Sequence, residues 1–470
     1  MAQRSQVGRT MKSMGALLVL GAAAAVVLVT SASLGEHPLL SRRPTGEPQM
    51  ISYQQLPAPP SMMDGAMCEW VPASASSPLS AAFPQETPAY SPTQTQSETA
   101  TREPVRVVRD DAHSYSSVAV DVERNEVVMT DENLFSIMVY DRTTNTPPTA
   151  RMSEPKRMIS GLATEIEFQC GLYIDPGSGD IFAVNNDTVD KLVIFSREAR
   201  GNVPPDRHLE TPHGTFGVAV SEKAQELFLT VQHDAAVVVY HKAAQGEDAP
   251  IRLLQGNRTR LADPHGIAVD EENGLMFITN HGSVHDVSPD SSGDDSRRAE
   301  SKPNWPLNRR FGVPGSGKLL PPSITVHAIS ASGNAPPLRV IEGPKTQMNW
   351  PTGIAFDPER NEVFVANDAG NNVLVFDASA NGDAAPIRVL QGPTSMIKNP
   401  TGVFVDVKND ELWVTNFGNH SATVYRRSAA GDPAPLRVIR AAPIGKQALM
   451  IGNPGAIAYD TKREEVLVPN

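Results

Sequence analysis

Short runs of apolar residues, separated by polar turn-forming residues, fill the chain from about residue 104 to its end. Such runs, with alternating apolar and polar positions, are typical of β-strands joined by tight turns. The phrase Thr352-Gly-Ile-Ala-Phe-Asp357 returns 49 residues later as Thr401-Gly-Val-Phe-Val-Asp406. Four runs in a repeat of this length predict an all-β fold, a β-propeller with four antiparallel strands in each blade.

The blade count follows from the polar residue that ends the first run of each repeat. The last repeat stops at Asn470 after two runs, whereas Pro104-Val-Arg106-Val-Val108 resembles an unpaired fourth run. We therefore expect seven blades, with six as the fallback, and a last blade closed by strands from both ends of the domain. Closure of this kind removes the exposed edge of a sheet. The seven marker residues are Asp121, Asp175, Ser221, Asp270, Asp357, Asp406 and Asp460.

The fourth run of six repeats is marked by an arginine, commonly in a Pro-x-Arg phrase. A residue that recurs in every repeat marks the architecture rather than a single site, so we assign these arginines to the scaffold. They are Arg151, Arg207, Arg252, Arg339, Arg388 and Arg437.

Two phrases resemble the NHL and YVTN classes of β-propeller repeat, as found in bacterial exported proteins of this type. They are Asp263-Pro-His-Gly-Ile-Ala-Val-Asp270 and Phe364-Val-Ala-Asn367. The resemblance covers about residues 104–470 and implies a ring of six blades for NHL proteins or seven for YVTN proteins. It also implies a ligand site at the mouth of the central channel. Such families include binding modules, interaction platforms and enzymes such as lactonases and lyases, so the resemblance leaves the activity open.

The first 103 residues differ in composition from the repeats. Basic residues precede an apolar run at 15–29 and small residues follow it, which predicts a signal peptide or an N-terminal membrane anchor over 1–33. Residues 34–103 are rich in Pro, Ser and Thr and are expected to form a disordered spacer. The repeats would then lie in the periplasm, outside the cell, or anchored to the outer side of the cytoplasmic membrane. Membrane contact is expected only through the N-terminal segment.

Charge and motif content narrow the function classes. The net charge of −12 argues against nucleic-acid partners, which require clustered Lys and Arg. A nucleophile elbow, a phosphate-binding glycine loop and a His-Glu-x-x-His motif are all absent from the sequence. These absences favour a binding module over an enzyme, and no catalytic residue is assigned. No cofactor is expected apart from a possible divalent metal, Zn²⁺ or Ca²⁺.

Four residues are candidate metal ligands on the loop face of the propeller. His233 and His281 follow the second runs of adjacent repeats, His265 precedes a first run, and Asp368 has the register of His281 in the next repeat. Imidazole and carboxylate groups suit Zn²⁺, which can polarise a carbonyl group or activate water. The alternative is that they are polar loop groups that hydrogen-bond locally.

An insertion at 283–322 separates Asn280, which ends a second run, from the third run at Ile324. Long loops without periodicity are commonly functional or disordered. Aromatic and Arg side chains dominate binding hot spots. The sequence therefore predicts an exported scaffold that binds a protein, peptide or glycan at the loop face; the alternative is a metal-assisted lactonase or lyase. Candidate ligand-binding residues are Trp305, Arg309, Arg310 and Phe311, and Asp290, Asp294 and Asp295 are weaker Ca²⁺ candidates.

Overall fold

The computed structural model describes residues 112–186, 189–284, 318–448, 458–460 and 465–467. All of them belong to the unit Pro104–Asn470. No helix among these residues is long and apolar enough to span a membrane. Several predicted features lie outside the described residues: the signal or anchor at 1–33, the spacer at 34–103, the run at 104–108 and most of the insertion at 283–322.

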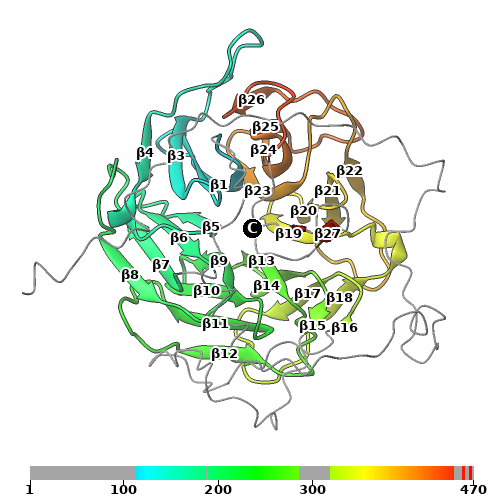
Figure 1. Cartoon of the computed structure of the whole chain (residues 1–470). Helices are drawn as coiled ribbons and strands as arrows, with labels where there is room; N and C mark the ends of the chain where they lie inside the picture. Colours follow the sequence, from blue (N-terminus) through cyan, green and yellow to red (C-terminus); the bar gives the residue numbers. More distant parts are fainter. Residues whose placement is uncertain (1–111, 187–188, 285–317, 449–457, 461–464, 468–470) are drawn as a thin grey trace, which may run out of the picture. The chain divides into compact units, whose positions relative to one another are not determined.

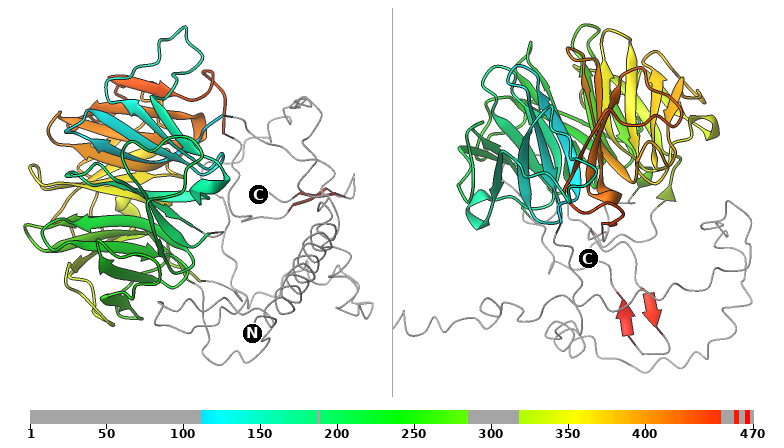
Figure 2. Two further views of the ribbon diagram at one scale, coloured as in Figure 1. Left: turned by 90° about the vertical axis from the view of Figure 1, so that its left-hand side faces the viewer. Right: turned by 90° about the horizontal axis from the view of Figure 1, so that it is seen from above.

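The described repeats form a β-propeller of six blades, each a four-stranded antiparallel sheet (Figures 1 and 2). The first strands β1, β5, β9, β13, β19 and β23 surround the centre of the ring (Figure 1). Blade 1 consists of β1 (Tyr115–Asp121), β2 (Glu126–Asp131), β3 (Ser136–Asp141) and β4 (Arg157–Ser160). Blade 2 consists of β5 (Gln169–Ile174), β6 (Ile181–Asn185), β7 (Lys191–Phe195) and β8 (Arg207–Glu210). Blade 3 consists of β9 (Thr215–Ser221), β10 (Glu226–Val231), β11 (Ala236–His241) and β12 (Arg252–Gln255). Blade 4 consists of β13 (Pro264–Asp270), β14 (Leu275–Asn280), β17 (Ser323–Ala328) and β18 (Arg339–Glu342). Blade 5 consists of β19 (Pro351–Asp357), β20 (Glu362–Asn367), β21 (Asn372–Asp377) and β22 (Arg388–Leu390). Blade 6 consists of β23 (Pro400–Asp406), β24 (Glu411–Asn416), β25 (Ser421–Arg426) and β26 (Arg437–Arg440).

The ring closes directly between blade 1 and blade 6, where β1 packs against β23. Arg142 Nη1 lies 2.7 Å from Glu411 Oε2, and the amide of Thr146 donates to the carbonyl of Val438 at 2.7 Å. Because both blades already have four strands, this junction leaves no place for a seventh blade. The prediction of a propeller is confirmed with the six blades of the fallback, and the expectation of seven blades closed by both termini is wrong.

The seventh marker, Asp460, belongs to a separate pair of strands. β27 (Ala458–Asp460) pairs with β28 (Glu465–Leu467) in a two-stranded sheet of their own. A second small pair, β15 (Ser283–Val284) and β16 (Lys318–Leu319), stands at the two ends of the insertion. The marker therefore identifies a strand end correctly but does not identify membership of a blade.

Glycine at the third position of the first strand allows neighbouring blades to approach closely. A Cβ atom on Gly353 would lie 2.6 Å from the carbonyl oxygen of Thr401 in blade 6. Gly266 in blade 4 approaches the carbonyl of Thr352 in the same way. The second strands add hydrogen bonds to these junctions, since Thr279 Oγ1 donates to the carbonyl of Thr352 at 2.5 Å. The Gly-Ile-Ala phrase thus reflects crowding of the inner strands.

The fourth-strand arginines serve the scaffold. Arg388 donates through both terminal nitrogens to Glu362 Oε1 and Oε2, each at 2.6 Å. Its guanidinium carbon also lies 5.7 Å from the centroid of the Phe364 ring, a cation–π arrangement. The corresponding arginine of blade 1 is Arg157 rather than Arg151. The strand β4 begins at Arg157, and the guanidinium of Arg157 forms an ion pair with Glu126.

Two connections of each blade meet on one face of the ring, here called the axial face. It consists of the residues that precede a first strand and those that follow a second strand. A backbone hydrogen bond joins these two segments in blade 4, from the amide of His281 to the carbonyl of Asp263 at 3.1 Å. Blade 5 has the same bond from Asp368 to Trp350, also at 3.1 Å. This arrangement brings the residues at the entry of the first strand beside those at the exit of the second strand.

Candidate metal centre

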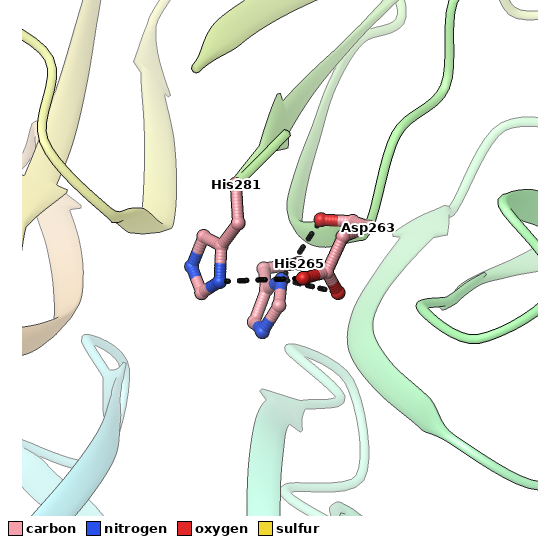
Figure 3. Close-up of side chains that lie close together, drawn as sticks. All are labelled: Asp263, His265 and His281. Atoms are coloured by element: carbon pink, nitrogen blue, oxygen red, sulfur yellow. Dashed lines mark hydrogen bonds and ion pairs between the residues drawn. The ribbon is translucent and has the colours of Figure 1, made fainter. Parts of the chain in front are cut away.

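Blade 4 brings together three side chains on the axial face: Asp263, His265 and His281 (Figure 3). Asp263 immediately precedes β13, His265 is its second residue, and His281 directly follows β14. β13 and β14 are antiparallel, with Pro264 opposite Asn280, so the entry of one strand lies beside the exit of the other. The two-residue separation of Asp263 from His265 therefore places both side chains near His281.

The potential ligand atoms of these three residues all lie within 4.8 Å of one another. His265 Nδ1 is 3.6 Å from Asp263 Oδ1, and His281 Nδ1 is 3.9 Å from Asp263 Oδ2. The two imidazole rings are stacked, with centroids 3.3 Å apart and planes inclined by 21°. Metal–ligand bonds of about 2.0–2.2 Å to nitrogen and oxygen can span atoms at such separations. These three residues could therefore hold a metal ion.

The electrostatics of His281 also suit metal binding. Its side chain is 2% exposed, and neither ring nitrogen has a hydrogen-bond partner. Burial, followed by the neighbouring His265, lowers the pKa of His281 well below its ordinary value. The imidazole is therefore neutral, which is the form that binds a metal. Buried polar atoms without partners are rare in folded proteins, and an ion between these residues would satisfy one of them.

Hydrogen bonds orient the other two side chains. His265 Nδ1 lies 3.0 Å from the backbone carbonyl of Asp263, to which it donates in the tautomer that carries its proton on Nδ1. Ser283 Oγ donates to Asp263 Oδ2 at 2.6 Å. Metal-binding histidines commonly donate their second nitrogen to a carbonyl or carboxylate group, and ligating carboxylates accept similar bonds.

The other two predicted ligands lie outside this group of three. His233 in blade 3 stacks on His213, with ring centroids 5.1 Å apart, and its Nε2 accepts from Gln232 Nε2 at 3.1 Å. Asp368 Oδ1 accepts from Asn399 Nδ2 at 3.0 Å. Burial raises the pKa of Asp368 to about 6, and the Asn399 bond partly opposes that rise. A metal role for His233 and Asp368 remains a prediction.

The candidates in the insertion cannot be placed in the same way. Those proposed for ligand contact and for Ca²⁺ binding lie outside the described residues; they are Trp305, Arg309, Arg310, Phe311, Asp290, Asp294 and Asp295.

Two residues of this region were not identified from the sequence, Asp263 and Trp350. Both immediately precede a first strand, at equivalent positions of blades 4 and 5. In the sequence Asp263 stands out only as part of an Asp-Pro phrase. The feature that could identify it as a ligand is its spacing of two residues from His265. The Trp350 ring centroid lies 4.8 Å from that of His281, and on the other side Phe216 lies 4.1 Å from His265. These rings form what we call the aromatic row: Phe216, His265, His281 and Trp350.

Comparison with known proteins adds little to this picture. No protein-family model and no curated protein matches the chain. Among solved structures it is similar to a functionally unknown protein from Desulfotomaculum acetoxidans DSM 771, with 11% identity, a TM-score of 0.43, and coverage of 72% of this chain and 89% of that one. It is also similar to hydrazine synthase from Kuenenia stuttgartiensis, with 11% identity, a TM-score of 0.43, and coverage of 70% and 99%. Neither similarity carries an argument about function, and the relation to NHL and YVTN repeats stays a resemblance.

Proposed function

We propose that this propeller is a metal-dependent binding protein. Asp263, His265 and His281 would hold one divalent ion, and an oxygen atom of the ligand would complete its coordination. The observation that carries the proposal is the convergence of their ligand atoms within 4.8 Å, in a site where His281 is buried without hydrogen-bond partners. The six-bladed ring is the scaffold that positions them, in keeping with the NHL-like phrases of its repeats.

The donor set favours Zn²⁺ over Ca²⁺. Two imidazole nitrogens and one carboxylate oxygen are common Zn²⁺ ligands, and three protein ligands leave a fourth position for water or a bound molecule. Ca²⁺ instead takes six to eight oxygen ligands. The proposed ligand therefore meets the ion through its own oxygen on the axial face.

We further propose that the protein works outside the cytoplasmic membrane. The support is the composition of residues 1–33, which resembles a signal peptide or membrane anchor, followed by the Pro- and Ser-rich spacer at 34–103. Such a spacer would hold the propeller away from the membrane. This part of the proposal rests on the sequence alone.

A metal-assisted lactonase or lyase is the second candidate. A site with three protein ligands keeps a position at which the ion can polarise a carbonyl group. In blade 5, burial raises the pKa of Asp368 to about 6. A general base works best when its pKa lies near the working pH, so this shift suits Asp368 to that role near neutral pH. The Asp368 amide is hydrogen-bonded to the carbonyl of Trp350, whose ring contacts His281.

Elemental analysis and zinc titration of the purified full chain test the proposal. We expect one tightly bound zinc ion per chain, and His281→Ala should weaken zinc binding by about 100-fold or more because it removes a ligand. His213→Ala is the matched control, since His213 lies on the axial face of blade 3 outside the cluster. A wild-type chain that takes up no zinc, or His281→Ala with unchanged zinc affinity, would contradict the proposal.

A further inference from the structure

We propose that Trp350 is a stacking platform beside the metal centre and that the ligand is an acidic sugar, a pyranose ring that carries a carboxylate. This inference rests on the proposed metal-dependent binding. The carboxylate would bind the ion and the sugar ring would lie against the indole.

The position of Trp350 links it to the metal centre. Its ring centroid lies 4.8 Å from that of His281, with the planes inclined by 47°. Measured over the whole residue, Trp350 is 51% exposed, whereas His265 and His281 are 6% and 8% exposed. The aromatic row is thus covered along its middle and open at the indole. If an oxygen atom of the ligand binds the ion at His281, the adjoining part of the ligand would lie against the exposed indole ring.

The exposure of Trp350 is not required by the propeller. Trp413, in the second strand of blade 6, is fully buried and lies beneath the guanidinium of Arg437, 5.4 Å from the ring. That tryptophan performs the packing task that Phe364 performs in blade 5. Trp350 instead leaves half of a large apolar side chain in water, which costs free energy unless a partner covers it.

The backbone of Trp350 gives a second reason to expect a specific role. Its φ is 60°, in the left-handed region that bulky residues rarely adopt. The equivalent residues of three other blades are Gly214, Asp263 and Asn399, which tolerate this region. Residues held in sparsely populated backbone conformations cluster at active sites and ligand sites. The equivalent position of blade 2 is also aromatic, Phe168, but its ring packs against Phe135 at 5.0 Å.

The surroundings of the indole favour a sugar over a flat aromatic ligand. The Asp368 amide donates to the backbone carbonyl of Trp350 at 3.1 Å, and its carboxylate accepts from Asn399 Nδ2 at 3.0 Å. The neighbouring Asn349 is exposed. Carboxylate and carboxamide groups can bond to ring hydroxyls, while the C–H face of a sugar covers the indole. An aromatic ligand is usually enclosed by apolar side chains on both faces.

The metal explains why the sugar should be acidic. A divalent ion with three protein ligands accepts an anionic oxygen in its remaining position. The chain itself carries a net charge of −12, so it offers little general attraction for an anion. Binding of a sugar acid should therefore require the ion, and a neutral sugar of the same shape should bind more weakly.

Calorimetric titration of the full chain with D-glucuronate, D-glucose and benzoate tests the inference, with zinc content measured on every sample. Zinc-loaded protein should bind D-glucuronate, and protein stripped by a chelator should not. Trp350→Ala should lower that affinity by about tenfold with zinc content unchanged, and Trp350→Phe should recover part of the loss. Leu338→Ala is the control, because Leu338 is an exposed apolar residue of blade 4 that precedes β18.

The outcomes separate the two proposals. A protein that binds zinc but not D-glucuronate, or that binds benzoate or D-glucose as tightly, would overturn the acidic-sugar assignment alone. Unchanged affinity in Trp350→Ala would overturn the platform role. A wild-type chain without zinc affinity would overturn both the metal centre and this inference.

Discussion

Blades 4 and 5 are built from the same repeat but present different chemistry on the axial face. Both have glycine at the third position of the first strand, Gly266 and Gly353, and both pair a proline with the asparagine that ends the second strand. Where blade 4 has Asp263, His265 and His281, blade 5 has Trp350, Thr352 and Asp368. Thr352 Oγ1 donates to the backbone carbonyl of Ala366 at 3.2 Å, whereas His265 takes part in a potential metal site. The inner positions thus maintain the ring, and the residues at the strand entries and exits determine the site.

The largest effect should come from breaking what the two blades share. Gly353→Val would place a Cβ atom 2.6 Å from the carbonyl oxygen of Thr401, and Gly266→Val meets the carbonyl of Thr352. Each change should destabilise the fold by about 3 kcal/mol or more, by similar amounts in both blades. Denaturant unfolding measures the loss. Gly382→Asn is the control, because nothing lies within 4 Å of its Cβ position and Asn tolerates its φ of 69°. Normal stability of either valine variant would contradict the crowding of the inner strands.

A smaller effect should distinguish the outer strands of the two blades. Blade 5 begins its second strand with Glu362, which accepts both bonds of Arg388, whereas blade 4 has Leu275 there. Arg339 of blade 4 donates to the carbonyl of Ala378 at 2.7 Å. Arg388→Ala leaves the buried carboxylate of Glu362 without its partner and should cost about 1–3 kcal/mol. Arg339→Ala should cost less when both are measured by thermal unfolding, and equal costs would refute this distinction.

The smallest effect should appear in the pH dependence of stability. Burial raises the pKa of Asp368 from its ordinary 3.8 to about 6. The folded state therefore binds the proton of the Asp368 carboxyl group more tightly than the unfolded state does. The stabilisation of the fold by this proton is complete below about pH 4 and is lost as the pH rises through about 6. The Asp368→Asn variant has no such proton to lose. Its stability relative to the wild type should therefore rise by about 1–2 kcal/mol between pH 4 and pH 7. Identical pH profiles for the two proteins between pH 4 and 7 would show that Asp368 titrates normally.

The repeat made most of the fold predictable, because periodic apolar runs report strand length and the residue types of tight turns. The number of blades was not predictable from strand markers alone. Closure depends on β1 packing against β23, between segments more than 250 residues apart, and no local pattern encodes that contact. Asp460 has the marker of a first strand, but the pairing described for its strand β27 is with β28, which follows it.

The site was partly predictable for a similar reason. His265 and His281 were identified because they interrupt the repeat at the axial face, and the structure places them together. In blade 3 the residue in register with His281 is Gln232, whose amide donates to the carbonyl of Gly214 at 2.8 Å, so His233 lies one position further along. Blade 3 also has Gly214 and Phe216 where blade 4 has Asp263 and His265, and the His233 ring stacks on His213. The sequence places a residue near the exit of a strand, whereas its register and its partners depend on where that strand ends and on which residues enter the adjacent strand.

X-ray absorption spectroscopy at the zinc edge, on the zinc-loaded full chain, tests the central claim most directly. A metal held by blade 4 predicts a first shell of nitrogen and oxygen atoms at about 2.0–2.2 Å, with the outer-shell scattering of two imidazole rings. His281→Ala should reduce the imidazole contribution to one ring. A shell of oxygen atoms alone, or a spectrum that His281→Ala leaves unchanged, would contradict the account.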